Sequence, residues 1–193
     1  GAKSAGKIID GHCGDIMTEK RFGFIAVIGP PNAGKSTLSN ALVGQKVAIV
    51  THKAQTTRAR LRAVVMHKQS QVVLVDTPGI FSGGKKLDKA MVQEAWSGAE
   101  EADAVFVVLD ASRALPAETE LVLAGVKNTS KPVILVLNKV DAVKREKLLE
   151  LTQQLNEAAN FADTFMVSAL KETGLEELKS YLSQLVPEGP WHY

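Results

Sequence analysis

The sequence predicts an α/β fold in three layers: a mostly parallel six-stranded sheet with one antiparallel strand and helices on both faces. Short apolar runs of strand length alternate with segments whose apolar residues repeat at helical spacing. Two of the apolar runs are separated only by residues 67–70, a spacing typical of a hairpin. That hairpin would place one antiparallel strand beside the parallel ones.

The elements follow in order along the chain. The expected strands are residues 22–29, 61–66, 71–76, 104–110, 132–138 and 164–168. The expected helices are residues 35–43, 87–101, 116–127, 145–160 and 174–185. In the last two helices, leucines at helical spacing are expected to be buried; these are Leu148, Leu149, Leu151, Leu155, Leu175, Leu178, Leu182 and Leu185.

Length and composition limit the kinds of protein that this chain can be. Its 193 residues fit one domain with its own hydrophobic core. The net charge of +2 does not indicate that this domain binds nucleic acid through electrostatic attraction alone. Cys13 is the single cysteine, which excludes an intramolecular disulfide and is compatible with a cytoplasmic location. We expect residues 1–16 to be a leader or disordered tail and residues 17–193 to be the domain.

A glycine-rich loop carries the clearest chemical signal. Residues 29–36 match the pattern G-x-x-x-x-G-K-[ST], and they follow an expected strand and open an expected helix. This context favours a phosphate-binding loop, the P-loop of NTPases, over a chance glycine-rich turn. Lys35 would contact the β- and γ-phosphates, and the Ser36 hydroxyl would bind Mg²⁺. The expected nucleotide contacts are Gly29, Pro30, Pro31, Asn32, Ala33, Gly34, Lys35, Ser36 and Thr37.

Two further segments are expected to surround the γ-phosphate. Asp76 ends an expected strand and would reach Mg²⁺ directly or through water, and Gly79 offers a backbone N–H to the γ-phosphate. A simple Pro-Gly turn is the alternative for this segment, whose expected contacts are Asp76, Thr77, Pro78 and Gly79. In residues 51–58, Thr57 is favoured over Thr56 as the switch hydroxyl that binds Mg²⁺. The expected metal ligands are therefore Ser36, Thr57 and Asp76, and the catalytic groups are Lys35, Thr57 and Gly79.

Two segments in the C-terminal half of the chain are expected to recognise guanine. Asn138-Lys139-Val140-Asp141 closes an expected strand. The Asp141 carboxylate accepts hydrogen bonds only, so it suits the N1–H and 2-amino donors of guanine, which adenine lacks. Lys139 can lay its aliphatic stem along the base. Backbone N–H groups of Ser168, Ala169 and Leu170 could read guanine O6, and the Leu170 side chain is also expected to belong to the core.

Together these motifs resemble the translation-factor-like small GTPases, and residues 44–50 and 53–58 resemble the Era GTPase family in particular. The resemblance covers residue 22 to the end. It implies a Mg²⁺-dependent GTPase that assists ribosome assembly and binds small-subunit (16S-type) ribosomal RNA and the 30S subunit. The RNA contact would come from a KH domain after the GTPase domain, and this chain stops where that domain would begin. Peripheral membrane association of the full-length protein stays open, and we expect this domain to be a monomer.

The resemblance also bears on hydrolysis. Ile80 stands where Ras-like proteins place a glutamine that orients water, as in the subgroup of GTPases to which Era belongs. Ras-like enzymes gain rate from an arginine finger, and Arg58 is a weak in-chain candidate for that role. Related GTPases use an asparagine in the phosphate loop to hold K⁺ as a finger-like cation, and here Asn32 is the candidate for that role. Three other functions remain alternatives at this point: a P-loop kinase or ATPase, a related GTPase acting on transfer RNA or at a membrane, and a scaffold that binds GTP without hydrolysing it.

Overall fold

The structure, a computed structural model, describes residues 20–43, 60–76 and 88–192. In this part of the chain six strands form one sheet in the order β2-β3-β1-β4-β5-β6. The strands are β1 (Arg21–Ile28), β2 (Arg60–His67), β3 (Ser70–Asp76), β4 (Ala104–Asp110), β5 (Val133–Asn138) and β6 (Asp163–Met166). The helices are α1 (Lys35–Val43), α2 (Lys89–Ala99), α3 (Glu118–Asn128), α4 (Arg145–Ala158) and α5 (Leu175–Leu185), with a 3₁₀ turn η1 (Val140–Ala142).

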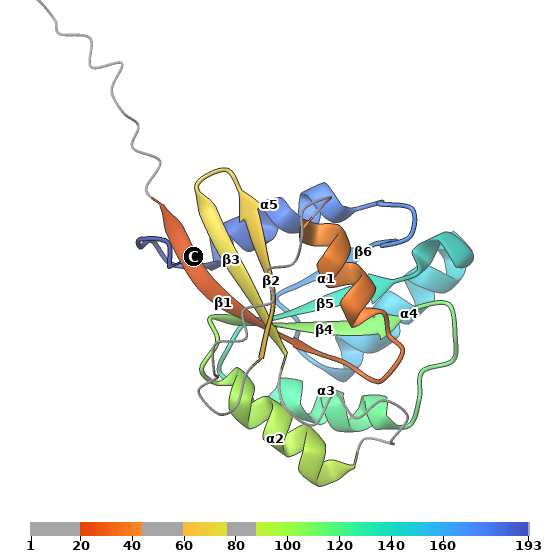
Figure 1. Cartoon of the computed structure of the whole chain (residues 1–193). Helices are drawn as coiled ribbons and strands as arrows, with labels where there is room; N and C mark the ends of the chain where they lie inside the picture. Colours follow the sequence, from red (N-terminus) through yellow and green to blue (C-terminus); the bar gives the residue numbers. More distant parts are fainter. Residues whose placement is uncertain (1–19, 44–59, 77–87, 193) are drawn as a thin grey trace, which may run out of the picture.

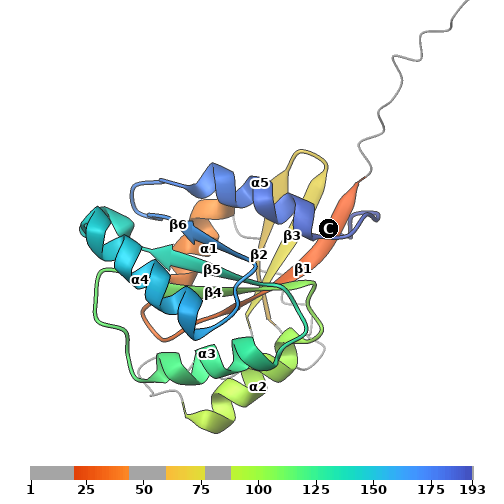
Figure 2. The same ribbon diagram turned by 180° about the vertical axis from the view of Figure 1, so that it is seen from behind.

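Helices cover both faces of the sheet, α1 and α5 on one side and α2, α3 and α4 on the other (Figures 1 and 2). Successive side chains of a strand point to opposite faces, so a strand buried on both sides is apolar throughout. In β4, Phe106 and Val108 pack with α1 and α5, whereas Val107 and Leu109 pack with the other three helices. Burial of such side chains on two faces is the main favourable contribution to the stability of this fold.

The predicted fold class is confirmed. β2 pairs antiparallel with β3, and the other strand pairs are all parallel. The helix expected from residue 87 begins at Lys89, because the Asp88 carboxylate accepts the Met91 N–H at 2.8 Å and caps it. The strand expected over residues 164–168 ends at Met166, and Ser168 instead bridges to Thr173 in the following turn.

Two leucines expected to be buried are exposed, so those predictions are wrong. In α4, Leu148 and Leu155 lie seven residues apart on the buried stripe, whereas Leu149 is turned outward and is 55% exposed. Leu149 is rotated by about 100° from Leu148 around the helix axis, which takes it off the stripe that packs on the sheet. Leu170, expected to belong to the core as well as to the guanine loop, is 77% exposed at the tip of the β6–α5 turn.

The residues after α5 pack against the start of β1 (Figure 1). The Phe22 N–H donates to the Pro187 carbonyl at 3.0 Å, and the Gly189 N–H donates to the Lys20 carbonyl at 2.7 Å. The His192 ring stacks on Phe22 with centroids 4.2 Å apart. Both ends of the described chain therefore lie at the edge of the sheet opposite the motif loops. Among the described residues, every helix is too short or too polar to cross a membrane.

Candidate nucleotide-binding site

The motif residues gather where the parallel strands end. Val27 near the end of β1 pairs with Asp76 at the end of β3, and Asp110 at the end of β4 pairs with Asn138 at the end of β5. In open α/β sheets the loops that follow these carboxyl ends form the ligand crevice. The register thus brings the phosphate loop, Asp76 and the predicted guanine motif to one edge of the sheet.

The phosphate loop holds Lys35 in a defined position. Lys35 is the first residue of α1 and is 8% exposed. Its ammonium group donates to the carbonyl oxygens of Gly29 and Pro30 at 2.9 and 2.8 Å. These hydrogen bonds keep a buried positive charge at the N-terminal end of a helix, a position that favours binding of phosphate.

Two glycines let this loop approach its neighbours closely. A Cβ on Gly29 would collide with the carbonyl oxygen of Val108 in β4. Gly34 has φ +91°, and a Cβ there would collide with the Asn138 side-chain nitrogen. Asn32 also lies in the left-handed region, at φ 65°, which asparagine tolerates better than most residues. The backbone conformation of the phosphate loop therefore depends on Gly29, Gly34 and Asn32.

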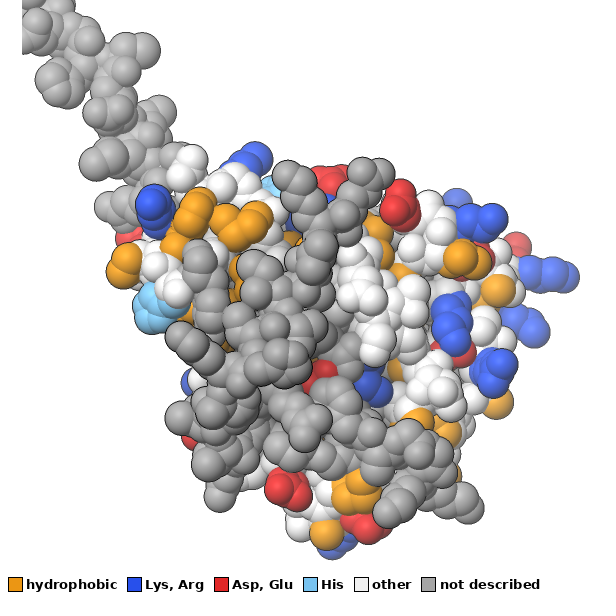
Figure 3. Space-filling model, in the orientation of Figure 1, with side chains coloured by type: hydrophobic (Ala, Val, Ile, Leu, Met, Phe, Trp, Pro, Cys, Tyr) orange, Lys and Arg blue, Asp and Glu red, His pale blue; other side chains and the backbone are white. Residues whose placement is uncertain are grey.

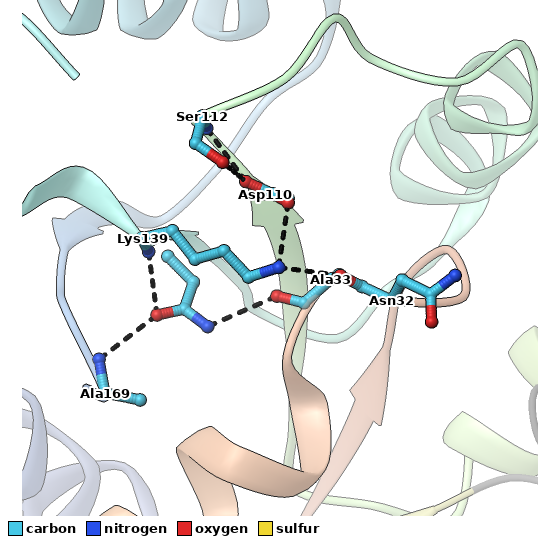
Figure 4. Close-up of polar contacts among 7 residues, drawn as sticks. Asn32, Ala33, Asp110, Ser112, Lys139 and Ala169 are labelled. Carbon is cyan, nitrogen blue, oxygen red and sulfur yellow. Dashed lines mark hydrogen bonds and ion pairs between the residues drawn. The ribbon is translucent and has the colours of Figure 1, made fainter. Parts of the chain in front are cut away.

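Asn138 joins the phosphate loop to the two predicted guanine loops (Figure 4). Its side-chain N–H₂ donates to the Ala33 carbonyl at 3.2 Å. Its side-chain oxygen accepts the Lys139 N–H at 2.8 Å and the Ala169 N–H at 3.3 Å. Asn138 is 2% exposed, so this hydrogen-bonded side chain lies inside the protein and connects three loops.

The Asp141 carboxylate is oriented by Ser168. The Ser168 hydroxyl donates to Asp141 Oδ1 at 2.6 Å and accepts the Lys171 N–H at 3.0 Å. Ser168 is fully buried, whereas Asp141 is exposed. Sequence reasoning expected Ser168 to act through its backbone, and the structure gives its side chain an orienting contact as well. The Ala169 N–H, expected to read O6, already has Asn138 as a partner at 3.3 Å.

Lys139 has two partners that connect it to other strands. It has φ 63°, and its ammonium group donates to Asp110 Oδ2 at 2.9 Å and to the Asn32 carbonyl at 3.2 Å. Burial favours the neutral form of Asp110, but hydrogen bonds from Ser112 and Lys139 outweigh it and lower the pKa of this carboxyl. Sequence reasoning missed Asp110 and Ser112. The available signal was an acidic residue closing a strand, as Asp76 does.

The expected magnesium ligands are described only in part. Asp76 is 1% exposed at the end of β3, and Ser36 is exposed in the first turn of α1. A carboxylate and a hydroxyl are the hard oxygen ligands that Mg²⁺ prefers, so these two residues fit that ion. Thr57, Thr77, Pro78 and Gly79, like Thr56, Arg58 and Ile80, lie outside the described residues, and the predictions made for them stay predictions.

Positive side chains border the guanine loops. On the face shown in Figure 3, Lys and Arg side chains gather on the right, over the start of α4 and the β6–α5 loop. Lys144, Arg145 and Lys171 are exposed in these segments. On the other side of the phosphate loop, a cavity of about 230 Å³ is lined by Pro31, Asn32 and Arg113 among others. A second cavity, of about 360 Å³ between α2 and α3, contains none of the motif residues.

The fold and the joined loops define a P-loop nucleotide-binding domain with a guanine-type base motif. The family model described as 50S ribosome-binding GTPase matches residues 24–139. The chain therefore belongs to the 50S ribosome-binding GTPase family, and several curated relatives that are at least 50% identical to it are Era proteins.

Two curated relatives illustrate the similarity. GTPase Era of Agrobacterium fabrum is 52% identical over 179 residues, which cover 93% of this chain and 56% of that protein. GTPase Era of Bradyrhizobium sp. strain ORS 278 is 54% identical over 173 residues, which cover 90% and 56%. The chain thus spans little more than half the length of these relatives.

Two solved structures of Era and one of another G domain superpose on this chain. Era in complex with MgGDPNP and nucleotides 1506–1542 of 16S ribosomal RNA superposes with a TM-score of 0.70 at 35% identity, covering 90% of this chain and 60% of that one. A variant of Aquifex aeolicus Era bound to GDP and AlF₄⁻ gives 0.67 at 34% identity, covering 88% and 58%. The G domain of the Thermotoga maritima FeoB iron transporter gives 0.58 at 27% identity, and there the match covers 98% of the other chain.

Proposed function

We propose that this domain binds GTP with Mg²⁺ and hydrolyses it to GDP and phosphate. The observation that carries this proposal is the Asn138 side chain, which connects Ala33 of the phosphate loop to Ala169 of the guanine loop. One ligand with phosphates at one end and a base at the other would span the joined loops. The Era relative bound to MgGDPNP supports this assignment.

Guanine selectivity would come from Asp141. Both carboxylate oxygens would accept from guanine, Oδ1 while also holding the Ser168 hydroxyl. Adenine would present no donor at N1 and no 2-amino group, so the base would give the carboxylate no hydrogen bond. Sites that rely on such polar pairing reject the wrong ligand by about 10⁴-fold or more. Rejection of adenine would disfavour the alternative that this domain is a P-loop kinase or ATPase, because those enzymes use ATP.

Hydrolysis transfers the γ-phosphoryl group to water. A P–O bond to water forms, the bond to the bridging oxygen breaks, and its electron pair goes to the β-phosphate of GDP. Lys35 would neutralise charge on the β- and γ-phosphates, and Mg²⁺ held by Ser36, Asp76 and Thr57 would supply further positive charge. The Gly79 N–H would contact the γ-phosphate.

We also propose K⁺ as a second cation, bound through Asn32. The Asn32 side chain points away from Asn138 and Lys139 (Figure 4), so neither of them occupies its amide oxygen. Neutral amide oxygen is a suitable ligand for a monovalent cation, which would then lie near the phosphates where negative charge develops.

We propose that the full-length protein is a cytoplasmic ribosome-assembly GTPase in which this domain, residues 17–193, is a monomeric switch and residues 1–16 are a leader or disordered tail. The Era relative solved with a 16S ribosomal RNA fragment supports an RNA partner. The RNA contact would belong to a KH domain that follows in the longer protein.

Phosphate release tests the proposed activity. With Mg²⁺, the protein should release phosphate from GTP and not from ATP, and chelation of Mg²⁺ should abolish release. Lys35→Met should remove the activity, whereas Lys127→Met, at the exposed end of α3 on the opposite edge of the sheet, should leave it unchanged. Equal release from ATP and GTP, or full activity in Lys35→Met, would contradict the proposal.

A further inference from the structure

We infer that Asp110 is a positioning residue, which holds Lys139 on the carbonyl of Asn32 and so connects the guanine loop to the phosphate loop. The inference rests on the nucleotide site proposed above and extends it to a residue outside the motifs predicted from the sequence. Figure 4 shows the arrangement: the Lys139 side chain reaches from the end of β5 to the end of β4, and its ammonium group meets both Asp110 and Asn32.

The Asp110 carboxylate is fixed on both sides. Its Oδ2 accepts from Lys139 Nζ at 2.9 Å, while its Oδ1 accepts from the Ser112 N–H at 2.8 Å and from the Ser112 hydroxyl at 2.5 Å. The side chain of Asp110 is only 13% exposed. With both oxygens committed, the carboxylate cannot rotate away from Lys139 without breaking hydrogen bonds to Ser112.

Lys139 needs such an anchor. Its side chain is 40% exposed, and a free lysine side chain samples many rotamers, so holding it in one of them has an entropic cost. The contact with Asp110 selects an extended rotamer before nucleotide arrives. The stem that the base is proposed to lie along is then already in place, so binding loses less conformational entropy.

The same ammonium group also reaches the phosphate loop. It donates to the carbonyl of Asn32, a residue in the left-handed region at φ 65°. Hydrogen bonds from a charged donor are roughly twice as strong as neutral ones. Asp110 therefore supports, through Lys139, the backbone of the loop that is proposed to hold the phosphates. Asn138 makes the second, independent connection between these loops.

A double-mutant cycle tests whether Asp110 acts through Lys139. Dissociation constants for the fluorescent nucleotide mant-GDP would be measured for Asp110→Asn, Lys139→Met and the double variant. Asp110→Asn should weaken binding about tenfold, the effect of about 1.4 kcal/mol. In the Lys139→Met background the same change should weaken binding less than about twofold, because the side chain through which it acts is gone.

Turnover and controls separate positioning from a general loss of structure. Asp110→Asn should raise KM for GTP while leaving kcat within about twofold, since pre-ordering assists binding of substrate and transition state alike. Asp163→Asn makes the same chemical change at an exposed position on the opposite edge of the sheet and should bind as the parent does. Ser112→Ala, at an exposed site, should weaken binding about threefold by loosening Asp110.

The outcomes are distinct. If the parent does not bind mant-GDP, the proposed site itself is wrong. If the parent binds and Asp110→Asn binds equally well, only the positioning role is overturned. If the effects of Asp110→Asn and Lys139→Met multiply, Asp110 acts independently of Lys139 and the inference is also overturned. Should Asp110→Asn fail to fold, the same cycle with Ser112→Ala decides between these results.

Discussion

Ser168→Ala should impair guanine recognition without touching the nucleotide directly. The Ser168 hydroxyl donates to Asp141 Oδ1 at 2.6 Å and is fully buried. Removing it frees an exposed carboxylate to rotate, so the two oxygens no longer face the proposed base position together. The Lys171 N–H also loses its acceptor, but Lys171 is exposed and water can replace it.

The size of this effect follows from the hydrogen bond that is lost. A hydrogen bond to a charged group contributes about 1.5–3 kcal/mol. Because Asp141 is exposed, the lower end applies, about 1.5 kcal/mol, or roughly a tenfold loss of affinity for GDP and GTP. Because this hydrogen bond is present without nucleotide, Ser168→Ala should also lower the thermal stability of the domain, so affinities are compared well below its melting temperature.

Displacement of mant-GDP by GTP, GDP and ATP measures the prediction. Ser168→Ala should lose about tenfold for GTP and GDP and nothing for ATP, so the preference for guanine narrows. Ser130→Ala, in the exposed turn before β5, is the matched control and should behave as the parent. An unchanged GTP affinity in Ser168→Ala would refute the idea that this hydroxyl orients Asp141.

Three further predictions concern other parts of the site. Turnover should be faster in KCl than in NaCl, and Asn32→Ala should abolish that preference; equal rates of the parent in both salts would argue against a K⁺ site. Ser36→Asn should weaken Mg²⁺-dependent binding of GTP more than binding of GDP, and equal losses measured by titration would remove Ser36 from the metal shell. The lowered pKa of Asp110 means that its carboxylate stabilises the fold above its ordinary titration range, and this contribution is lost as pH falls through the folded pKa. Asp110→Asn should therefore lower the melting temperature at pH 7, and its difference from the parent should shrink as pH falls through the folded pKa of Asp110; equal melting temperatures at pH 7 would contradict this.

Local patterns in the sequence were sufficient to predict the strands of the sheet and the phosphate loop. The apolar runs that became β4 and β5 are buried on both faces, and the pattern around Lys35 has its predicted context between β1 and α1. Contacts distant in sequence were not predictable in this way. Asp110 and Lys139 are 29 residues apart, and Asn138 and Ala33 are 105 apart. Their meeting depends on strand order and register, which no local pattern contains.

Which residues of a helix face the core also could not be predicted from local sequence patterns alone. The spacing of leucines in α4 was compatible with more than one buried stripe, and packing on the sheet selected Leu148 and Leu155 over Leu149. Propensity and period define a helix, but its neighbours decide which side is covered. The role of the Ser168 side chain escaped prediction for a related reason, since its partner Asp141 follows a different strand.

Base selectivity tests whether Asp141 gives this domain its preference for guanine nucleotides. Asp141→Asn replaces one acceptor with a donor, and xanthine carries an oxygen at C2 where guanine carries an amino group. Phosphate release with Mg²⁺ would be measured from GTP, XTP and ATP for both proteins. The parent should use GTP and neither of the others, and Asp141→Asn should lose GTP and gain XTP. Unchanged use of GTP with no gain for XTP would remove Asp141 from the base pocket and contradict the account.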